Sequence, residues 1–248
     1  MCTFAWETGT NGDLWACFNR DEQRSRAAAE APCLYPGPQG TLGYARDPEG
    51  GGTWLAVSSQ GFAVALLNSY ATGGSLSKGG GRSRGLLVRD LAATASGEEA
   101  EKALRNGQPE AYAPFHLFIL SPEGVLKADW DGTRLTLGEA RDGWFTTSSY
   151  RPGSIPVIRK KAWDDFHANH PEAGRAALAR RLREKAPDPA EGMTMDRDDA
   201  RTVSQTEVRT GTGGFTMVYR ARAADGDGFE DPLMLTYPEE GPVHGREG

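Results

Sequence analysis

The sequence predicts an α+β fold in which antiparallel strand hairpins form sheets and helices cover those sheets. Short turns join neighbouring apolar segments, and no crossover helix separates the two members of a strand pair. The predicted elements follow the order strands, helices, strands, helices, strands. Grouped hairpins with segregated helices are typical of this class, whereas alternating βαβ units indicate a parallel sheet.

Length and composition suit one globular domain. The 248 residues include 38% hydrophobic and 25% charged residues, which is ordinary for a soluble chain with a buried core. The sequence contains no internal repeat and no linker that would divide it. We therefore expect a single domain over residues 1–248, with a loose polar tail at 237–248.

The first predicted hairpin brings polar residues to the start of the chain. Residues 2–6 and 13–19 are predicted strands, and the Asn-Gly pair at 11–12 is a strong hairpin turn signal. Because the second strand returns antiparallel to the first, we expect the polar segment 19–22 to lie beside Cys2.

The next stretch combines irregular segments with a second strand pair. Residues 24–52 are rich in alanine, proline and glycine and are predicted to form an irregular surface loop. Residues 53–58 and 62–68 are predicted strands, and the apolar run in the second one indicates burial on both faces. The glycine-rich segment 76–85 is either a flexible connector, which we favour, or an anion cradle at a helix start.

The remaining elements are two helical groups and two strand groups. Helices are predicted at 86–95 and 98–104, with Ser96 capping the second one. The other predicted elements are strands at 115–120, 125–130, 134–137 and 144–147, helices at 157–169 and 172–185, and strands at 202–209, 215–221 and 233–236.

Charge and cysteine content exclude several classes of protein. The 28 basic and 34 acidic residues give a net charge of −6, which argues against a nucleic-acid-binding domain. No apolar run reaches the roughly 18 residues of a membrane span, and no signal peptide is apparent. Three cysteines without metal-type spacing favour a reducing, cytoplasmic setting and no bound metal. The sequence leaves the oligomeric state open.

Cys2 is the first candidate site residue. A small residue at this position favours removal of the initiator methionine, which would leave Cys2 with both a thiol and a free α-amine. An α-amine has a pKa near 8 and can take a proton from a neighbouring nucleophile. The alternative is that Cys2 is a small apolar residue at the start of a strand.

Several ordered motifs resemble one family over most of the chain, most strongly over residues 1–90. The motifs are Met1-Cys2, Asn19-Arg20-Asp21-Glu22, Gly51-Gly52-Thr53-Trp54-Leu55 with Ser58 and Gly61, Asn68, Arg82-Ser83-Arg84-Gly85 with Asp90, and Arg201-Thr202 with Ser204. Their order and spacing are similar to those of the NRDE family, also called transport and Golgi organisation 2. Ala200 departs from the family pattern, which has a threonine there.

The resemblance implies a fold and a set of site residues. The NRDE family is similar to N-terminal-nucleophile hydrolases of the bile-salt hydrolase and penicillin V acylase branch, which implies a four-layer αββα sandwich. By motif, Cys2 falls on their nucleophile, Asp21 on the aspartate that holds its α-amine, and Asn68 on an oxyanion-hole asparagine. Arg20 is a shifted match to their arginine, and Ser148 stands where a second oxyanion-hole asparagine is expected.

Two functions follow from this resemblance. The first is hydrolysis of an amide or thioester bond of a small molecule, with Arg20 lowering the pKa of the Cys2 thiol and Arg201 binding a substrate carboxylate. The second is a haem-trafficking or lipid-homeostasis carrier that performs no catalysis. The candidate haem ligands are Cys2, His116, His167 and His170.

Each candidate also has a purely structural interpretation. Arg20 and Asp21 would then form a surface ion pair, Asn68 would end a strand, Arg201 would cap a sheet edge, and the two helical histidines would face solvent.

Overall fold

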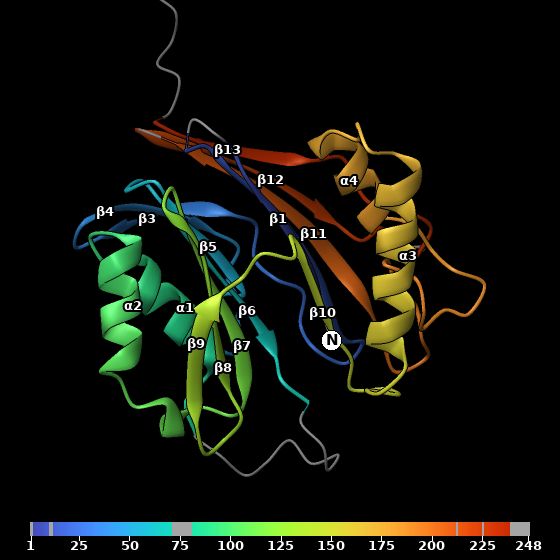
Figure 1. Ribbon diagram of the computed structural model, residues 1–248, viewed down its shortest axis with the longest axis horizontal. Coiled ribbons are helices and arrows are strands. Elements are labelled where there is room, and N and C mark those ends of the chain that lie inside the picture. Colours follow the sequence, from blue (N-terminus) through green and yellow to red (C-terminus); the bar gives the residue numbers. More distant parts are fainter. Residues whose placement is uncertain (1, 10–11, 71–80, 212, 225, 239–248) are drawn as a thin grey trace, which may run out of the picture.

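Two antiparallel sheets lie face to face, and a pair of helices covers the outer face of each (Figure 1). The computed structural model describes residues 2–9, 12–70, 81–211, 213–224 and 226–238. The order of layers is helix, sheet, sheet, helix, which confirms the predicted αββα sandwich.

In the described part of the chain, the first sheet has six strands in the order β10-β1-β2-β11-β12-β13. These strands are β1 (Cys2–Thr8), β2 (Leu14–Gln23), β10 (Trp144–Thr147), β11 (Ala200–Gly211), β12 (Gly214–Ala221) and β13 (Leu233–Tyr237). Helices α3 (Ile155–Asn169) and α4 (Arg175–Leu182) cover its outer face (Figure 1).

The second sheet has seven described strands, in the order β3-β4-β5-β6-β7-β8-β9. They are β3 (Cys33–Gly37), β4 (Gly40–Tyr44), β5 (Leu55–Ser58), β6 (Phe62–Asn68), β7 (Phe115–Ser121), β8 (Gly124–Trp130) and β9 (Leu135–Glu139). Helices α1 (Arg84–Ala92) and α2 (Gly97–Arg105) cover it, and a 3₁₀ turn at Pro109–Ala111 follows them. The predicted cap is confirmed, because the Ser96 hydroxyl accepts a hydrogen bond from the Glu99 amide at 3.2 Å.

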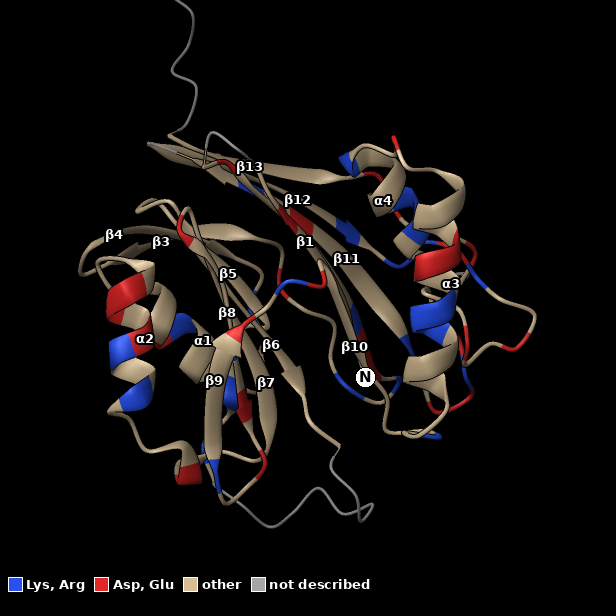
Figure 2. Cartoon of the chain, in the orientation of Figure 1, with Lys and Arg blue, Asp and Glu red and all other residues tan. Residues whose placement is uncertain are grey.

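The core is divided into three apolar layers by the alternation of side chains along the strands. Aromatic rings fill the layer between the sheets: Phe118 lies 5.3 Å from Phe4 and 5.1 Å from Trp6 between ring centroids. Alternate residues face the helices, so that Trp15 and Trp144 pack with Trp163 of α3. Charged residues concentrate on α2, α3 and α4, while the strands are mostly uncharged (Figure 2).

Most predicted elements are confirmed, but the predicted loop at 24–52 is wrong in part. This segment contains β3 and β4, which form one edge of the second sheet. Pro36 interrupts the strand pattern in the sequence, yet an edge strand tolerates a proline because one side of its backbone lacks a partner strand. The segment therefore folds as strands although its composition is typical of a loop.

Many other element boundaries differ from the predictions by a few residues, including those of β2 and β13. β2 continues to Gln23 instead of ending at Asn19, because β11 pairs with it there from Ala200 onward. β13 includes Tyr237, which the prediction had placed in the tail, and residues 239–248 of the predicted tail lie outside the described part of the chain. Residues 76–80 of the glycine-rich segment lie outside it as well, whereas Arg84 and Gly85 begin α1. Among the described helices, none is long and apolar enough to cross a membrane.

Candidate functional site

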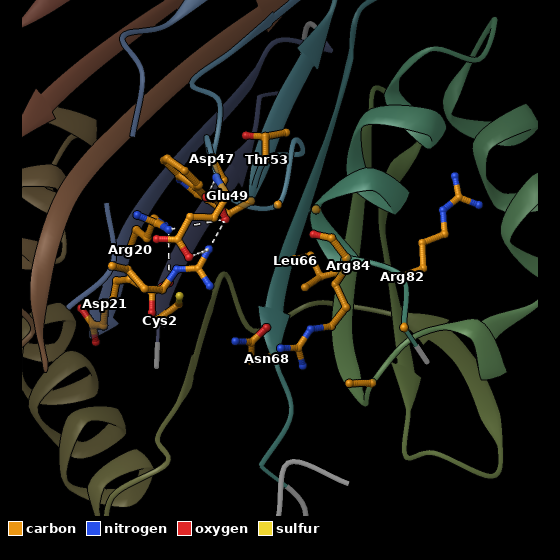
Figure 3. Close-up of a pocket in the computed structure, with 18 residues that line it drawn as sticks. Cys2, Arg20, Asp21, Asp47, Glu49, Thr53, Leu66, Asn68, Arg82 and Arg84 are labelled. Atoms are coloured by element: carbon orange, nitrogen blue, oxygen red, sulfur yellow. Dashed lines mark hydrogen bonds and ion pairs between the residues drawn. The ribbon is translucent and has the colours of Figure 1, made fainter. Parts of the chain in front are cut away.

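A cavity of about 470 Å³ opens at the start of β1, where the two sheets and the start of α1 come together (Figure 3). Its described lining comes from segments that are distant in sequence. The lining residues are Cys2, Arg20, Asp21, Glu22, Arg26, Asp47, Glu49, Gly50, Thr53, Trp54, Leu66, Asn68, Gly81, Arg82, Ser83, Arg84, Gly85 and Ala113. The structure thus gathers four of the predicted site residues, Cys2, Arg20, Asp21 and Asn68, in one cavity.

Strand register places Cys2 at the centre of one wall. It lies directly opposite Arg20 on β2 and directly opposite Thr147 on β10. Residues opposite one another in an antiparallel pair project to the same face, so these three side chains point between the sheets. The first hairpin therefore brings the polar segment to Cys2, as predicted. Cys2 itself is only 8% exposed.

Asp21 points to the other face of the sheet, behind Cys2. Its Oδ1 accepts a hydrogen bond of 2.6 Å from the Thr202 hydroxyl. Its Oδ2 is buried, has no hydrogen-bond partner among the described residues, and lies 3.6 Å from Nη1 of Arg159. One carboxylate oxygen is thus held in place while the other can still accept a hydrogen bond.

Arg159 of α3 completes this buried network and was not predicted. It is fully buried, and it donates hydrogen bonds to Thr3 Oγ1 at 3.2 Å and to the Ala190 carbonyl at 3.1 Å. Thr146 beside it donates to the Cys2 carbonyl oxygen at 2.9 Å. In the sequence Arg159 is followed by two lysines, and only its position on the buried face of the helix sets it apart.

Arg20 belongs to a second network, which faces the cavity. Its guanidinium lies 4.5 Å from the Trp54 ring centroid and donates a 3.1 Å hydrogen bond to Glu22. Asp47 lies 3.9 Å from Arg20 and 2.7 Å from Arg26. The interpretation of Arg20 and Asp21 as a surface ion pair is wrong, because each is 5% exposed and each pairs with a different partner.

Burial has the largest effect on the pKa of the thiol of Cys2, the candidate nucleophile. It raises the pKa of the Cys2 thiol to about 11 in the chain that begins at Met1, although the α-amine at position 1 and Arg20 act in the opposite direction. Arg20 thus has the expected effect on the thiol pKa, but burial outweighs it. At neutral pH the thiol is protonated, and attack on a carbonyl requires a base that accepts its proton.

Gly52 and Gly85, which belong to two of the motifs, let two backbone segments of the cavity wall lie in direct contact. A Cβ on Gly52 would overlap the backbone of Gly85, and the Thr53 amide donates to the Gly85 carbonyl at 3.1 Å. Only glycine permits so close an approach of two backbones. This contact joins the segment before β5 to the start of α1.

Asn68 and Arg84 form the wall opposite Cys2 and Arg20 (Figure 3). The Asn68 amide nitrogen lies 3.5 Å from the Tyr70 hydroxyl, and burial raises the pKa of Tyr70 to about 12. Tyr70 therefore stays protonated at physiological pH. Arg84 donates to the Pro114 carbonyl at 2.8 Å.

Ser148 and Arg201 are not among the described residues that line the cavity. The Ser148 hydroxyl donates to the Tyr150 carbonyl and accepts from the Tyr150 amide at 3.2 Å, so it stabilises a local turn. Arg201 lies opposite Glu22 in the β2–β11 pair. Thr147, which precedes Ser148, instead faces the same side as Cys2, and its buried hydroxyl has no hydrogen-bond partner among the described residues.

The three histidines proposed as haem ligands are not among the residues that line this cavity. His116 Nδ1 lies 2.5 Å from Asp129 Oδ1, and His170 Nδ1 lies 3.0 Å from the Phe166 carbonyl oxygen. His167 packs at 4.8 Å against Trp163. The described residues contain no cluster of three or more His, Cys, Asp or Glu side chains that could hold a metal ion. Haem as a ligand stays a prediction.

Solved structures with the same architecture define the class of fold. Two variants of the conjugated bile acid hydrolase from Clostridium perfringens match over 97% of this chain and 94% of theirs, with 12% identity and TM-scores of 0.59 and 0.60. A Caenorhabditis elegans ortholog of N-acylethanolamine-hydrolyzing acid amidase covers 84% of this chain and 92% of its own, with 9% identity and a TM-score of 0.55. These proteins are N-terminal-nucleophile hydrolases, and this chain has the same sandwich fold.

The family assignment is more specific than the fold. The chain belongs to the Transport and Golgi organisation 2 family, whose pattern matches residues 1–139. This match confirms the resemblance seen in the motifs. The search of curated proteins returned no match.

Proposed function

We propose that this protein is an N-terminal-nucleophile hydrolase that cleaves an amide or thioester bond of a small molecule. The observation that carries the proposal is the position of Asp21 behind Cys2, with a buried carboxylate oxygen that has no hydrogen-bond partner among the described residues. A neutral α-amine on Cys2 is the partner that suits this oxygen, because its N–H can donate to the carboxylate while its lone pair stays free to accept a proton. Removal of Met1 would create that group.

Because the pKa of the Cys2 thiol is raised, the site must supply a base that accepts the thiol proton. The α-amine of the processed chain would take the thiol proton while Sγ attacks the carbonyl carbon. The same proton would then pass to the leaving amine or thiolate as the carbon–nitrogen or carbon–sulfur bond breaks. Water would hydrolyse the resulting thioester, restoring the Cys2 thiol and releasing a carboxylic acid.

Two side chains are suitable hydrogen-bond donors for the oxyanion. Asn68 lines the cavity across from Cys2, and Thr147 faces the same side of the sheet as Cys2. Thr147 is better placed for this role than Ser148, whose hydroxyl is used in a turn. A preorganised donor of this kind typically contributes about 2.7–4 kcal/mol to stabilisation of the transition state.

The first test has two measurements. Intact mass of the expressed protein reports whether Met1 is removed, and we expect a chain that begins at Cys2. A panel of acyl amides and acyl thioesters is then assayed with the native protein, Cys2→Ala and Cys33→Ser. We expect Cys2→Ala to lower the rate by about a thousandfold or more, as removal of a nucleophile does in other hydrolases.

Cys33→Ser is the matched control, because Cys33 is an exposed free cysteine. It should retain full activity. Retained Met1, or a Cys2→Ala variant as active as the native protein, contradicts the proposal. A reducing compartment, which we propose to be the cytoplasm, would keep the Cys2 thiol free.

A further inference from the structure

Most charged residues of the described cavity lining form ion pairs. Glu22 pairs with Arg20 at 3.1 Å, Asp47 pairs with Arg26 at 2.7 Å, and Glu49 lies 3.5 Å from Arg26. The other lining charges also have partners: Arg82 lies 2.5 Å from Asp90, and Asp21 lies 3.6 Å from Arg159. Within the described lining, Arg84 is the charged residue left without an oppositely charged partner within 4.0 Å.

Arg84 is partly buried, and its positive charge has no ion-pair partner among the described residues. Burial lowers its pKa, and its one hydrogen bond among the described residues is to the neutral Pro114 carbonyl at 2.8 Å. An arginine nevertheless keeps its charge, so a cation in this position lacks the counter-charge that buried ions normally have. Its remaining N–H groups have no hydrogen-bond acceptor among the described residues and could bind an anion.

The surroundings of Arg84 also favour a negative charge. Arg84 is the first residue of α1, where the helix dipole adds partial positive charge, and the first turn of α1 contains no acidic residue. Figure 3 shows Arg84 beside Asn68, on the side of the cavity opposite Cys2. A ligand bound to Arg84 would thus extend across the cavity toward the thiol.

We propose that Arg84 binds a free carboxylate of the substrate, so that the preferred substrates are small acyl amides or thioesters that carry a carboxylate. A planar guanidinium matches a carboxylate through two parallel hydrogen bonds. This inference names the substrate class of the hydrolase proposed above and rests on that function. It also transfers the carboxylate-binding role that the motifs implied for Arg201 to a residue that lines the cavity.

The test measures binding without turnover. In the Cys2→Ala background, isothermal titration calorimetry compares N-butanoylglycine with N-butanoylglycinamide, which differs by having a neutral amide in place of the carboxylate. We expect the carboxylate to bind about tenfold or more tightly, as hydrogen bonds to charged groups allow. Arg84→Gln should abolish this preference, and Arg84→Lys should retain only part of it because lysine lacks the planar fork.

Two variants serve as comparisons. Arg89→Gln changes an exposed arginine of the same helix, which pairs with Asp90 at 3.0 Å, and should leave the preference unchanged. Arg201→Gln tests the residue implied by the motifs and should also leave it unchanged. Circular dichroism with thermal melting establishes that Arg84→Gln is folded before binding is compared.

The outcomes separate this inference from the hydrolase proposal. Equal binding of the two ligands overturns the inference, as do a preference that survives Arg84→Gln, loss of the preference in Arg201→Gln, and tighter binding of inorganic phosphate than of N-butanoylglycine. If Arg84 confers the preference in the Cys2→Ala background and the native protein hydrolyses nothing, only the proposed reaction fails.

Discussion

At the scale of single residues, burial controls the chemistry of Cys2. A cysteine near a chain end would ordinarily be exposed and have a pKa near 8.5. Strand pairing on both sides of β1 buries this one and raises the pKa of its thiol to about 11. The site therefore needs a base at the moment of attack, which is the role that the proposed mechanism gives to the α-amine.

This pKa predicts how Cys2 is alkylated. The thiolate is the reactive form, so its rate of reaction with iodoacetamide should rise about tenfold per pH unit from pH 7 to 9.5, without a plateau. Mass spectrometry of the Cys2 peptide measures the rate, in a Cys33→Ser background because the exposed Cys33 would also react. Circular dichroism at each pH controls for unfolding. A plateau below pH 8 would show that the thiolate is stabilised at rest.

At the scale of single elements, α3 contributes to the site through one side chain. Arg159 is fully buried and connects this helix to Asp21, to Thr3 of β1 and to the Ala190 carbonyl. A buried arginine that pairs with a buried carboxylate leaves an uncompensated charge if one partner is removed. Such a loss typically destabilises a protein by about 3–5 kcal/mol.

We accordingly expect Arg159→Met to lower the free energy of unfolding by about 3–5 kcal/mol in urea titrations. Lys160→Ala is the matched control at the next position of the same helix. Lys160 makes an exposed ion pair with Asp164 at 2.7 Å, and such pairs contribute about 0–1 kcal/mol. If the two variants lose similar amounts, the buried network does not stabilise the fold.

At the scale of the whole molecule, the apolar layer between the sheets holds the cavity walls together. Phe118 of β7 contacts Phe4 and Trp6 of β1 and lies 5.4 Å from Phe145 of β10, so it connects strands of both sheets. The wall that carries Cys2 and the wall that carries Asn68 thus depend on one aromatic cluster. No described helix crosses between them.

Phe118→Ala should destabilise the fold by about 3–5 kcal/mol, because a fully buried phenylalanine is lost and a cavity is left between the sheets. Urea denaturation followed by tryptophan fluorescence measures the change. Leu233→Ala on the edge strand β13, at a side chain that is 50% exposed, should change stability by less than about 0.5 kcal/mol. A small effect of Phe118→Ala would mean that the sheets are held together elsewhere.

The sequence by itself determined most of the elements and the class of fold. Turn signals and apolar alternation depend on residues that are neighbours in the chain, so the hairpin of β1 and β2 and the approach of residues 19–22 to Cys2 could be derived from local pattern. Ordered motifs added the family. The pair β3 and β4 was missed, because an edge strand tolerates the prolines and glycines that normally indicate a loop.

The tertiary structure alone decided which polar side chains meet. Arg159 follows Thr3 by more than 150 positions, and nothing in its neighbours distinguishes a buried arginine from a solvated one. Thr147 and Ser148 are adjacent in sequence, yet strand alternation directs only Thr147 to the face of Cys2. Arg84 emerged as a candidate in the same way, since its lack of an ion-pair partner among the described residues is seen only once the contacts of the cavity lining are known. Local sequence specifies which elements form, whereas burial and pairing across the fold determine the chemistry of the site.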